Sequence, residues 1–180
     1  MRKMSYVKMS ILTAACIALC VVLPMAFHAI PRAGSIILPM HIPVLLCGLI
    51  VGWRFGLLAG LAGPFLSHLI MGMPPAPVLP GMLVELGIYG LVTGLLMLFV
   101  NTKKIYLDLY ICLIGAMLIG RIAAGITQAL IFASGNYSLA IWATSYFATS
   151  LPGLVIQLAF LPSVVLALES SGLIPRKYNL

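Results

Sequence analysis

The sequence predicts an all-α membrane protein with six transmembrane helices and with both termini in the cytoplasm. Of its 180 residues, 63% are hydrophobic and only 7% are charged, and the mean hydropathy is +1.19. These values lie outside the range of soluble globular domains. The apolar residues form six runs, and most lysines and arginines lie at the two ends of the chain or in the short turns between the runs. The whole chain, residues 1–180, is therefore interpreted as a single integral-membrane domain.

Each run is close to the length that a transmembrane helix requires, about 20 residues, or fewer where protein covers it. The first run follows a basic start and is longer than the apolar core of a secretion signal, so we interpret it as a span. The second is short and has Pro43 in its first turn, where proline is tolerated. The fifth is long and contains Arg121. The predicted spans are residues 9–28, 40–51, 55–71, 79–100, 105–133 and 144–168.

The distribution of basic residues predicts the orientation. Six spans place both termini on one side of the membrane, and Arg32 is the single basic residue expected in a loop on the other side. By the positive-inside rule, the termini are cytoplasmic. The net charge of +7 is thus a topology signal, and no nucleic-acid partner is expected. The basic residues on the terminal side are Arg2, Lys3, Lys8, Arg54, Lys103, Lys104, Arg176 and Lys177.

Polar side chains inside the spans form the candidate site, because such groups in hydrocarbon are costly unless they are paired or face a wet cavity. From the helical rise, Glu85 lies about two turns below the external surface and Arg121 lies at a comparable depth. Tyr89 shares a helix face with Glu85, and Gln128 shares one with Arg121. These polar residues form one layer just below the external surface, and this layer predicts a pocket that opens outward. The candidate substrate-binding residues are His41, His68, Glu85, Tyr89, Arg121, Gln128 and Gln157.

These residues also have structural interpretations. Glu85 and Arg121 would then neutralise each other without a ligand. His68 or Gln157 would then bond only a neighbouring backbone carbonyl. A third pattern, Ser10, Ala14 and Ala18 at four-residue spacing in the first span, suits either close contact with a partner helix or packing within the bundle.

Catalysis has less support in the sequence. Glu85 is the only carboxylate expected to be buried, and the chain contains no HExxH, GxSxG or phosphate-loop motif. We therefore expect no enzyme activity, no ATP hydrolysis, no metal site and no cofactor. Two alternatives stay open: a membrane-embedded enzyme acting on a lipid-like substrate, and a self-sufficient proton-coupled carrier or channel in which Glu85 titrates.

Four stretches resemble the substrate-binding S components of energy-coupling factor (ECF) transporters, and more narrowly their vitamin-type group. They are PMHIPVLLCGLIVGWRFGLLAGLAGPFLSHLIMGMPP, MLVELGIYGLVTGLL, AMLIGRIAAGITQAL and LPGLVIQLAFLPSVVLALESSGLI. The resemblance covers nearly the whole chain in order. The polar positions that recur in the family match His41, His68, Glu85, Arg121 and Gln157.

The resemblance implies a six-helix bundle in a prokaryotic plasma membrane that captures a water-soluble vitamin or precursor from outside. It also implies partners: a transmembrane coupling (T) subunit and two cytoplasmic ATPase subunits, on which the bundle topples to release its solute. The family motif that contacts the coupling subunit matches Ala14 and Ala18, and the loop 28–39 would gate the pocket. Metal-specific members of the family use a free N-terminal amine beside a Met-His start. Because the Met40-His41 pair is internal, this mode is absent here and a nickel or cobalt cargo is not expected.

In the binding hypothesis, Arg121 presents a donor fork suited to a carboxylate, and Glu85 accepts from an amine or a heterocycle. The other polar residues orient the solute, and Tyr137, Trp142 or Tyr146 provides aromatic surface. A pterin, a deazapurine, pantothenate, a pyridine vitamin and a flavin all fit this pattern, and the sequence alone does not choose among them.

Overall fold

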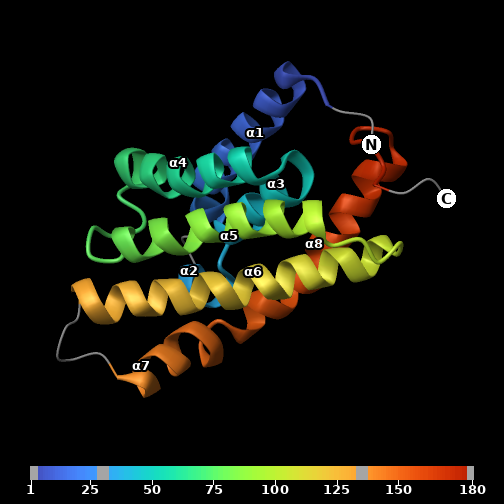
Figure 1. Ribbon diagram of the computed structural model, residues 1–180. Coiled ribbons are helices and arrows are strands. Elements are labelled where there is room, and N and C mark those ends of the chain that lie inside the picture. The colour runs from blue at the N-terminus through green and yellow to red at the C-terminus, as the bar shows by residue number, and fades with distance from the viewer. Residues whose placement is uncertain (1–3, 28–32, 133–137, 178–180) are drawn as a thin grey trace.

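The computed structural model describes residues 4–27, 33–132 and 138–177, and these residues form helices joined by short turns (Figure 1). Two of the helical segments are short pieces of π-helix. In chain order the elements are α1 (Tyr6–Ala26), α2 (Ala33–Ile37), α3 (His41–Val51), α4 (Trp53–Met71), α5 (Leu79–Phe99), α6 (Ile105–Thr127), η1 (Gln128–Phe132), α7 (Leu139–Ala143), η2 (Thr144–Ala148) and α8 (Leu151–Ser170).

Within the described residues, six helical stretches are long and apolar enough to cross a membrane, which confirms the predicted fold class. The sixth begins at Leu151, and the predicted start at residue 144 is wrong. Residues 144–148 belong to the separate segment η2, and the chain turns at Thr149 and Ser150. Pro152 explains the new start, since proline is favoured in the first turn of a helix.

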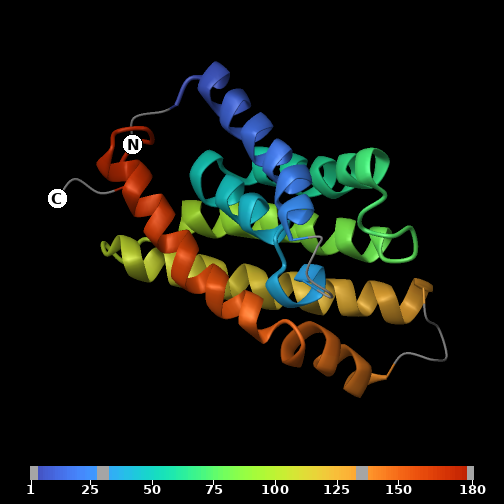
Figure 2. The same cartoon turned by 180° about the vertical axis from the view of Figure 1, so that it is seen from behind.

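Helices α4, α5 and α6 lie side by side, and α1 packs across α3 and α4 (Figures 1 and 2). Helix α3 lies among α1, α4 and α5, and its residues Val44, Leu45 and Cys47 are fully buried. The beginning of α1 and the end of α8 lie at the same end of the bundle, as six spans require. The charge distribution assigns this end to the cytoplasm.

Glycines bring α4 and α5 into backbone contact. A Cβ atom added to Gly90 would lie 2.0 Å from the carbonyl oxygen of Gly56, and one added to Gly60 would lie 2.2 Å from that of Leu86. Any larger residue at these positions would force the helices apart. Small residues replace the hydrophobic effect as the means of close helix packing in lipid.

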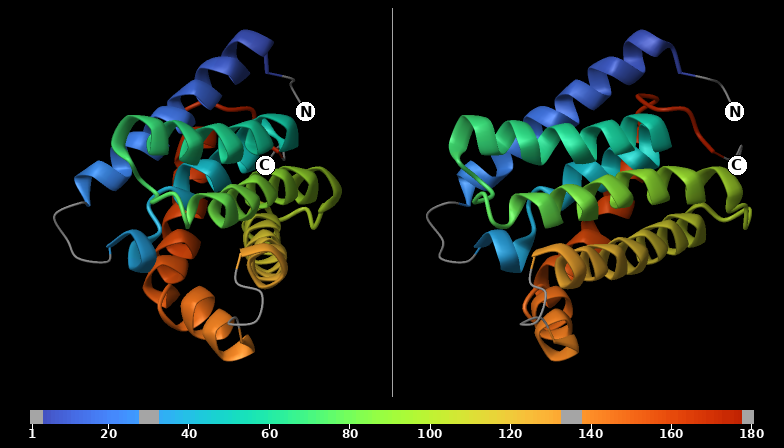
Figure 3. Two further views of the ribbon diagram at one scale, coloured as in Figure 1. Left: turned by 90° about the vertical axis from the view of Figure 1, so that its left-hand side faces the viewer. Right: turned by 60° about the vertical axis from the view of Figure 1, so that its left-hand side comes forward.

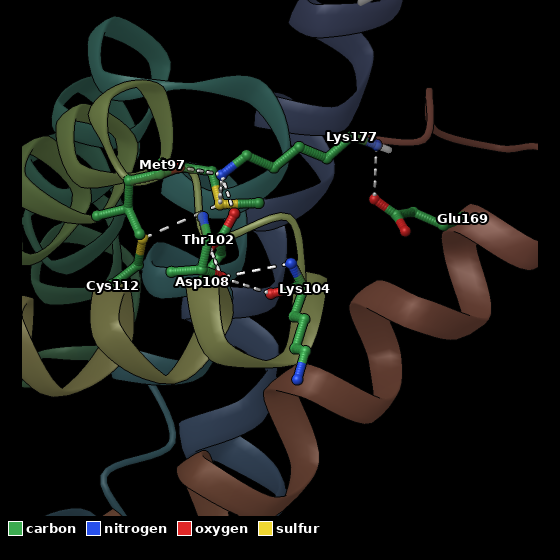
Figure 4. Close-up of polar contacts among 8 residues, drawn as sticks. Met97, Thr102, Lys104, Asp108, Cys112, Glu169 and Lys177 are labelled. Carbon is green, nitrogen blue, oxygen red and sulfur yellow. Dashed lines mark hydrogen bonds and ion pairs between the residues drawn. The ribbon is translucent and has the colours of Figure 1, made fainter. Parts of the chain in front are cut away.

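A buried ion pair closes the cytoplasmic end (Figure 4). Lys177 Nζ lies 2.5 Å from Asp108 Oδ2 and donates to the carbonyl oxygen of Val100 at 2.6 Å, while the Thr102 hydroxyl donates to Asp108 Oδ1 at 2.6 Å. Asp108 is fully buried, so the prediction that Glu85 is the only buried carboxylate is wrong. The sequence places Asp108 near the polar start of a span, but the segment after α8 folds back over it.

Candidate functional site

A cavity of about 970 Å³ lies at the end of the bundle opposite the beginning of α1 and the end of α8. Figure 3 (left) views the bundle from this end. The wall is formed by the end of α1, the segment around α2, the turn after α4, the start of α5, the end of α6 with η1, and residues 141–150. Most of it is apolar, with Met73, Pro74, Pro75, Val78 and Met82 on one part. Its size and polarity are those of a small-molecule site.

Glu85 and His41 meet on this wall, and both are buried. Glu85 belongs to the second turn of α5, and His41 begins α3. Glu85 Oε1 lies 3.5 Å from His41 Nε2, an electrostatic contact whose geometry is too poor for a hydrogen bond. The His41 ring meets the Tyr89 ring edge-on at 5.4 Å between centroids.

Arg121, on α6, is 1% exposed and lies at the same end of the cavity. Its Nε donates to the Tyr89 hydroxyl oxygen at 2.8 Å, and its Nη1 donates to Ser150 Oγ at 2.8 Å. Its guanidinium carbon lies 5.3 Å from the centre of the Phe147 ring, a cation–π contact. Glu85 Oε1 is 3.9 Å from Nε, so the charges form a loose ion pair.

Three further predicted residues take different positions. Gln128 lies on the cavity wall. His68 lies behind the wall, where its Nδ1 is 2.7 Å from the carbonyl oxygen of Pro74. Gln157 is fully buried and donates from Nε2 to the carbonyl oxygen of Leu38 at 3.5 Å. The structure therefore brings His41, Glu85, Arg121 and Gln128 onto the described wall, with Tyr89, His68 and Gln157 packed behind it.

Two buried polar side chains near the cavity keep unused capacity. Among the described residues, His41 Nδ1 and Gln157 Oε1 have no hydrogen-bond partner. Nearly all buried polar atoms in folded proteins have one, so each such exception calls for a water or a ligand atom. His41 lies on the cavity wall, where a bound solute can reach it.

The sequence analysis missed Ser150 and Phe147, whose side chains contact the Arg121 guanidinium group. Both lay within the predicted sixth span, which gave no reason to single them out. The sequence feature that could have identified Ser150 is Pro152. Proline is favoured in the first turn of a helix, and a helix that begins near Pro152 has Ser150 at its N-terminal cap position.

The three aromatic residues proposed for the pocket differ in position. Tyr146 lines the cavity, and Trp142 donates from Nε1 to the carbonyl oxygen of Arg121 at 3.0 Å. Tyr137 lies outside the described residues, as does the part 28–32 of the proposed gating loop. The rest of that loop forms α2, and Gly34, Ser35 and Leu38 line the cavity.

This arrangement of side chains is suited to binding a small molecule. It offers one cationic donor, one carboxylate acceptor and one imidazole on an apolar wall, the pattern of a binding pocket. In the part of the chain that the structure describes, no three His, Cys, Asp or Glu side chains are grouped to hold a metal ion. The four cysteines are free thiols buried among apolar side chains.

Comparison with known proteins gives one match. A family model described as "ECF transporter, substrate-specific component" matches residues 8–168, which is most of the chain. No curated protein and no solved structure matches it significantly. Six membrane-spanning helices agree with the family, whose members are multi-pass proteins of the plasma membrane. The chain therefore belongs to the family of substrate-specific components of ECF transporters.

Proposed function

We propose that this chain captures a small water-soluble vitamin or vitamin precursor for an ECF-type importer. Members of its family generally bind small solutes and work with a T subunit and ATPases. In the proposed cycle, the solute enters the cavity from outside the cell. The bundle then docks on a transmembrane coupling subunit with two cytoplasmic ATPases and topples, which releases the solute inside.

One observation carries the proposal: polar side chains from separate helices gather on one largely apolar cavity at the end assigned to the outside. Glu85, on α5, lies 3.5 Å from His41 on α3 and 3.9 Å from Arg121 on α6. Ion pairs that serve structure alone do not require a cavity beside them. Here the pair lines one of about 970 Å³, and the buried nitrogen of His41 has unused hydrogen-bonding capacity.

The proposed roles follow from the chemistry of each group. Arg121 donates to the solute, Glu85 accepts from it, and His41 and Gln128 set its orientation. Tyr89 fixes Arg121 from behind. We assign His68 and Gln157 a supporting role, because each contacts the backbone of a wall residue, Pro74 and Leu38 respectively.

Docking on the coupling subunit is assigned to α1. Ser10, Ala14 and Ala18 lie on one face of this helix, and all three are exposed in the isolated chain. This exposure favours the partner-contact interpretation over packing within the bundle. A face of small residues allows a second helix to approach closely in the membrane.

Solute binding by purified variants tests the pocket. We expect Glu85→Gln and Arg121→Met each to weaken binding of the co-purifying solute at least tenfold, measured by titration calorimetry and thermal shift in detergent. Glu169→Gln and Arg54→Met are the matched controls, because both side chains lie outside the cavity wall. Unchanged binding in both test variants would show that the pocket assignment is wrong.

Reconstitution tests the dependence on partners. The isolated chain in liposomes should bind the solute but not transport it. Addition of a coupling subunit and ATPases should give uptake that requires ATP. Transport by the isolated chain would contradict the proposal and favour a proton-coupled carrier, and turnover of a lipid would favour an enzyme.

A further inference from the structure

The charges on the described cavity wall are already matched within the protein. Glu85 and Arg121 are the charged wall residues in the described part of the chain, and their nearest charged atoms are 3.9 Å apart. His41 contacts the same Glu85 oxygen at 3.5 Å. Opposite charges this close inside a protein attract each other strongly. A solute therefore meets a paired donor and acceptor and not a lone charge.

Arg121 also gives two of its five N–H groups to side chains of the protein. Tyr89 takes Nε and Ser150 takes Nη1, each at 2.8 Å, and Phe147 lies against the guanidinium plane. Bidentate binding of a carboxylate uses two adjacent guanidinium nitrogens. Tyr89 takes the single N–H of Nε, so the bidentate face that Nε shares with a neighbouring nitrogen is closed to a carboxylate, and Ser150 takes one of the two N–H groups of Nη1.

A carboxylate solute would meet an unfavourable neighbour as well. If it bound Arg121, its charge would lie beside the Glu85 carboxylate, and like charges at this distance repel in a site shielded from water. A cation that bound Glu85 would meet Arg121 in the same way. The neutral edge of a ring amide or ureide, with C=O beside N–H, accepts from Arg121 and donates to Glu85 without adding charge.

We propose that the polar end of the cavity selects a solute whose buried end is a neutral ring amide or ureide, in preference to a carboxylate. The inference deepens the proposed function and rests on it. The apolar wall suits such a ring, because Met40, Met73 and Met82 have flexible, polarisable side chains that adapt to a flat heterocycle.

Competitive capture tests this preference. The purified full chain in detergent is incubated with a small-molecule cell extract to which lumazine, riboflavin, nicotinate, pantothenate and 4-aminobenzoate are added at equal concentrations. After washing, the bound compounds are released by denaturation and identified by mass spectrometry. Met82→Trp, which fills the cavity, gives the background.

We expect the retained solute to carry a neutral ring amide or ureide and to exceed every added carboxylate at least tenfold. A retained carboxylate, phosphate or amine without such a group would overturn the inference and leave the proposed function standing. Retention no higher than that of Met82→Trp would overturn both. The identity of the retained solute is read on the wild-type chain, so this reading does not depend on the folding of a test variant.

The variant Glu85→Gln gives a second, independent reading. It leaves Arg121 without its counter-charge, so the ratio of captured nicotinate to captured lumazine should rise at least tenfold over wild type. A merely structural role of Glu85 would lower both together. A ratio that stays constant while total capture falls would count against the inference.

Discussion

Tyr89 is one of the two residues whose side chains accept a hydrogen bond from Arg121. It is fully buried, and its hydroxyl oxygen accepts from Arg121 Nε at 2.8 Å. We expect Tyr89→Phe to weaken solute binding about tenfold, or about 1.4 kcal/mol, because a hydrogen bond to a charged group is lost. Titration calorimetry measures this. Tyr106→Phe, at an exposed site on α6, should bind as wild type, and equal affinity of the two variants would show that Tyr89 does not position Arg121.

At the scale of single residues, the sequence predicted depth well and direction poorly. The rise of a helix places Glu85 and Arg121 at one level, and the structure brings their side chains within 4 Å. His68 and Gln157 also lie near the site, but their side chains bond backbone carbonyls behind the wall. Which way each side chain points depends on how the helices are rotated against their neighbours, and the weak amphipathicity of membrane helices leaves no signal for that rotation.

At the scale of helices, contact between α4 and α5 depends on glycine. We expect Gly90→Ala to lower the free energy of unfolding by about 1–3 kcal/mol, because its Cβ would overlap the Gly56 carbonyl group and the backbones must shift. Thermal unfolding in detergent measures the loss. Gly115→Ala is the control, since the close neighbour of its Cβ is the end of the flexible Leu96 side chain. Equal melting temperatures for the two variants would disprove the close contact.

The segment formed by α7 and η2 covers part of the cavity and is attached to α6 by Trp142. The Trp142 ring packs against Gly125, where a Cβ atom would lie 2.2 Å from Nε1, and Nε1 donates to the Arg121 carbonyl. We expect Trp142→Phe to speed solute dissociation several-fold and to raise hydrogen exchange across residues 139–148, because the attachment loses its hydrogen bond.

Leu139→Ala is the control for this variant, because Leu139 is 78% exposed and lies outside the cavity wall. Dissociation and exchange rates in Trp142→Phe that equal those of Leu139→Ala would show that the segment is held by other contacts.

The segment formed by α7 and η2 is also where the prediction of helix boundaries from the sequence failed. Its apolar residues continue directly into those of α8, and hydrophobicity alone does not reveal the turn at Thr149 and Ser150 that separates them.

At the scale of the molecule, composition and basic turns were sufficient to predict six spans and a common end for both termini. They were not sufficient to predict the path of the chain after α8. This last segment folds back, with Ile174 buried in the core and Lys177 reaching Asp108 (Figure 4). Nearly 70 residues separate the members of this pair in sequence, so no local pattern predicts it. In the sequence, Lys177 counts only as one more cytoplasmic charge.

The Lys177–Asp108 pair is expected to contribute to the stability of the fold but not to solute binding at the other end of the bundle. Asp108→Asn leaves the buried ammonium group of Lys177 without its counter-charge and should lower the free energy of unfolding by about 3–5 kcal/mol. Lys104→Met, at an exposed site on the same turn, should have little effect. Solute affinity should stay unchanged in both variants while they are folded, because the cavity lies at the opposite end. Thermal unfolding measures the loss of stability, and titration calorimetry measures the solute affinity. An affinity loss in folded Asp108→Asn would show that the cytoplasmic ion pair and the cavity are energetically coupled.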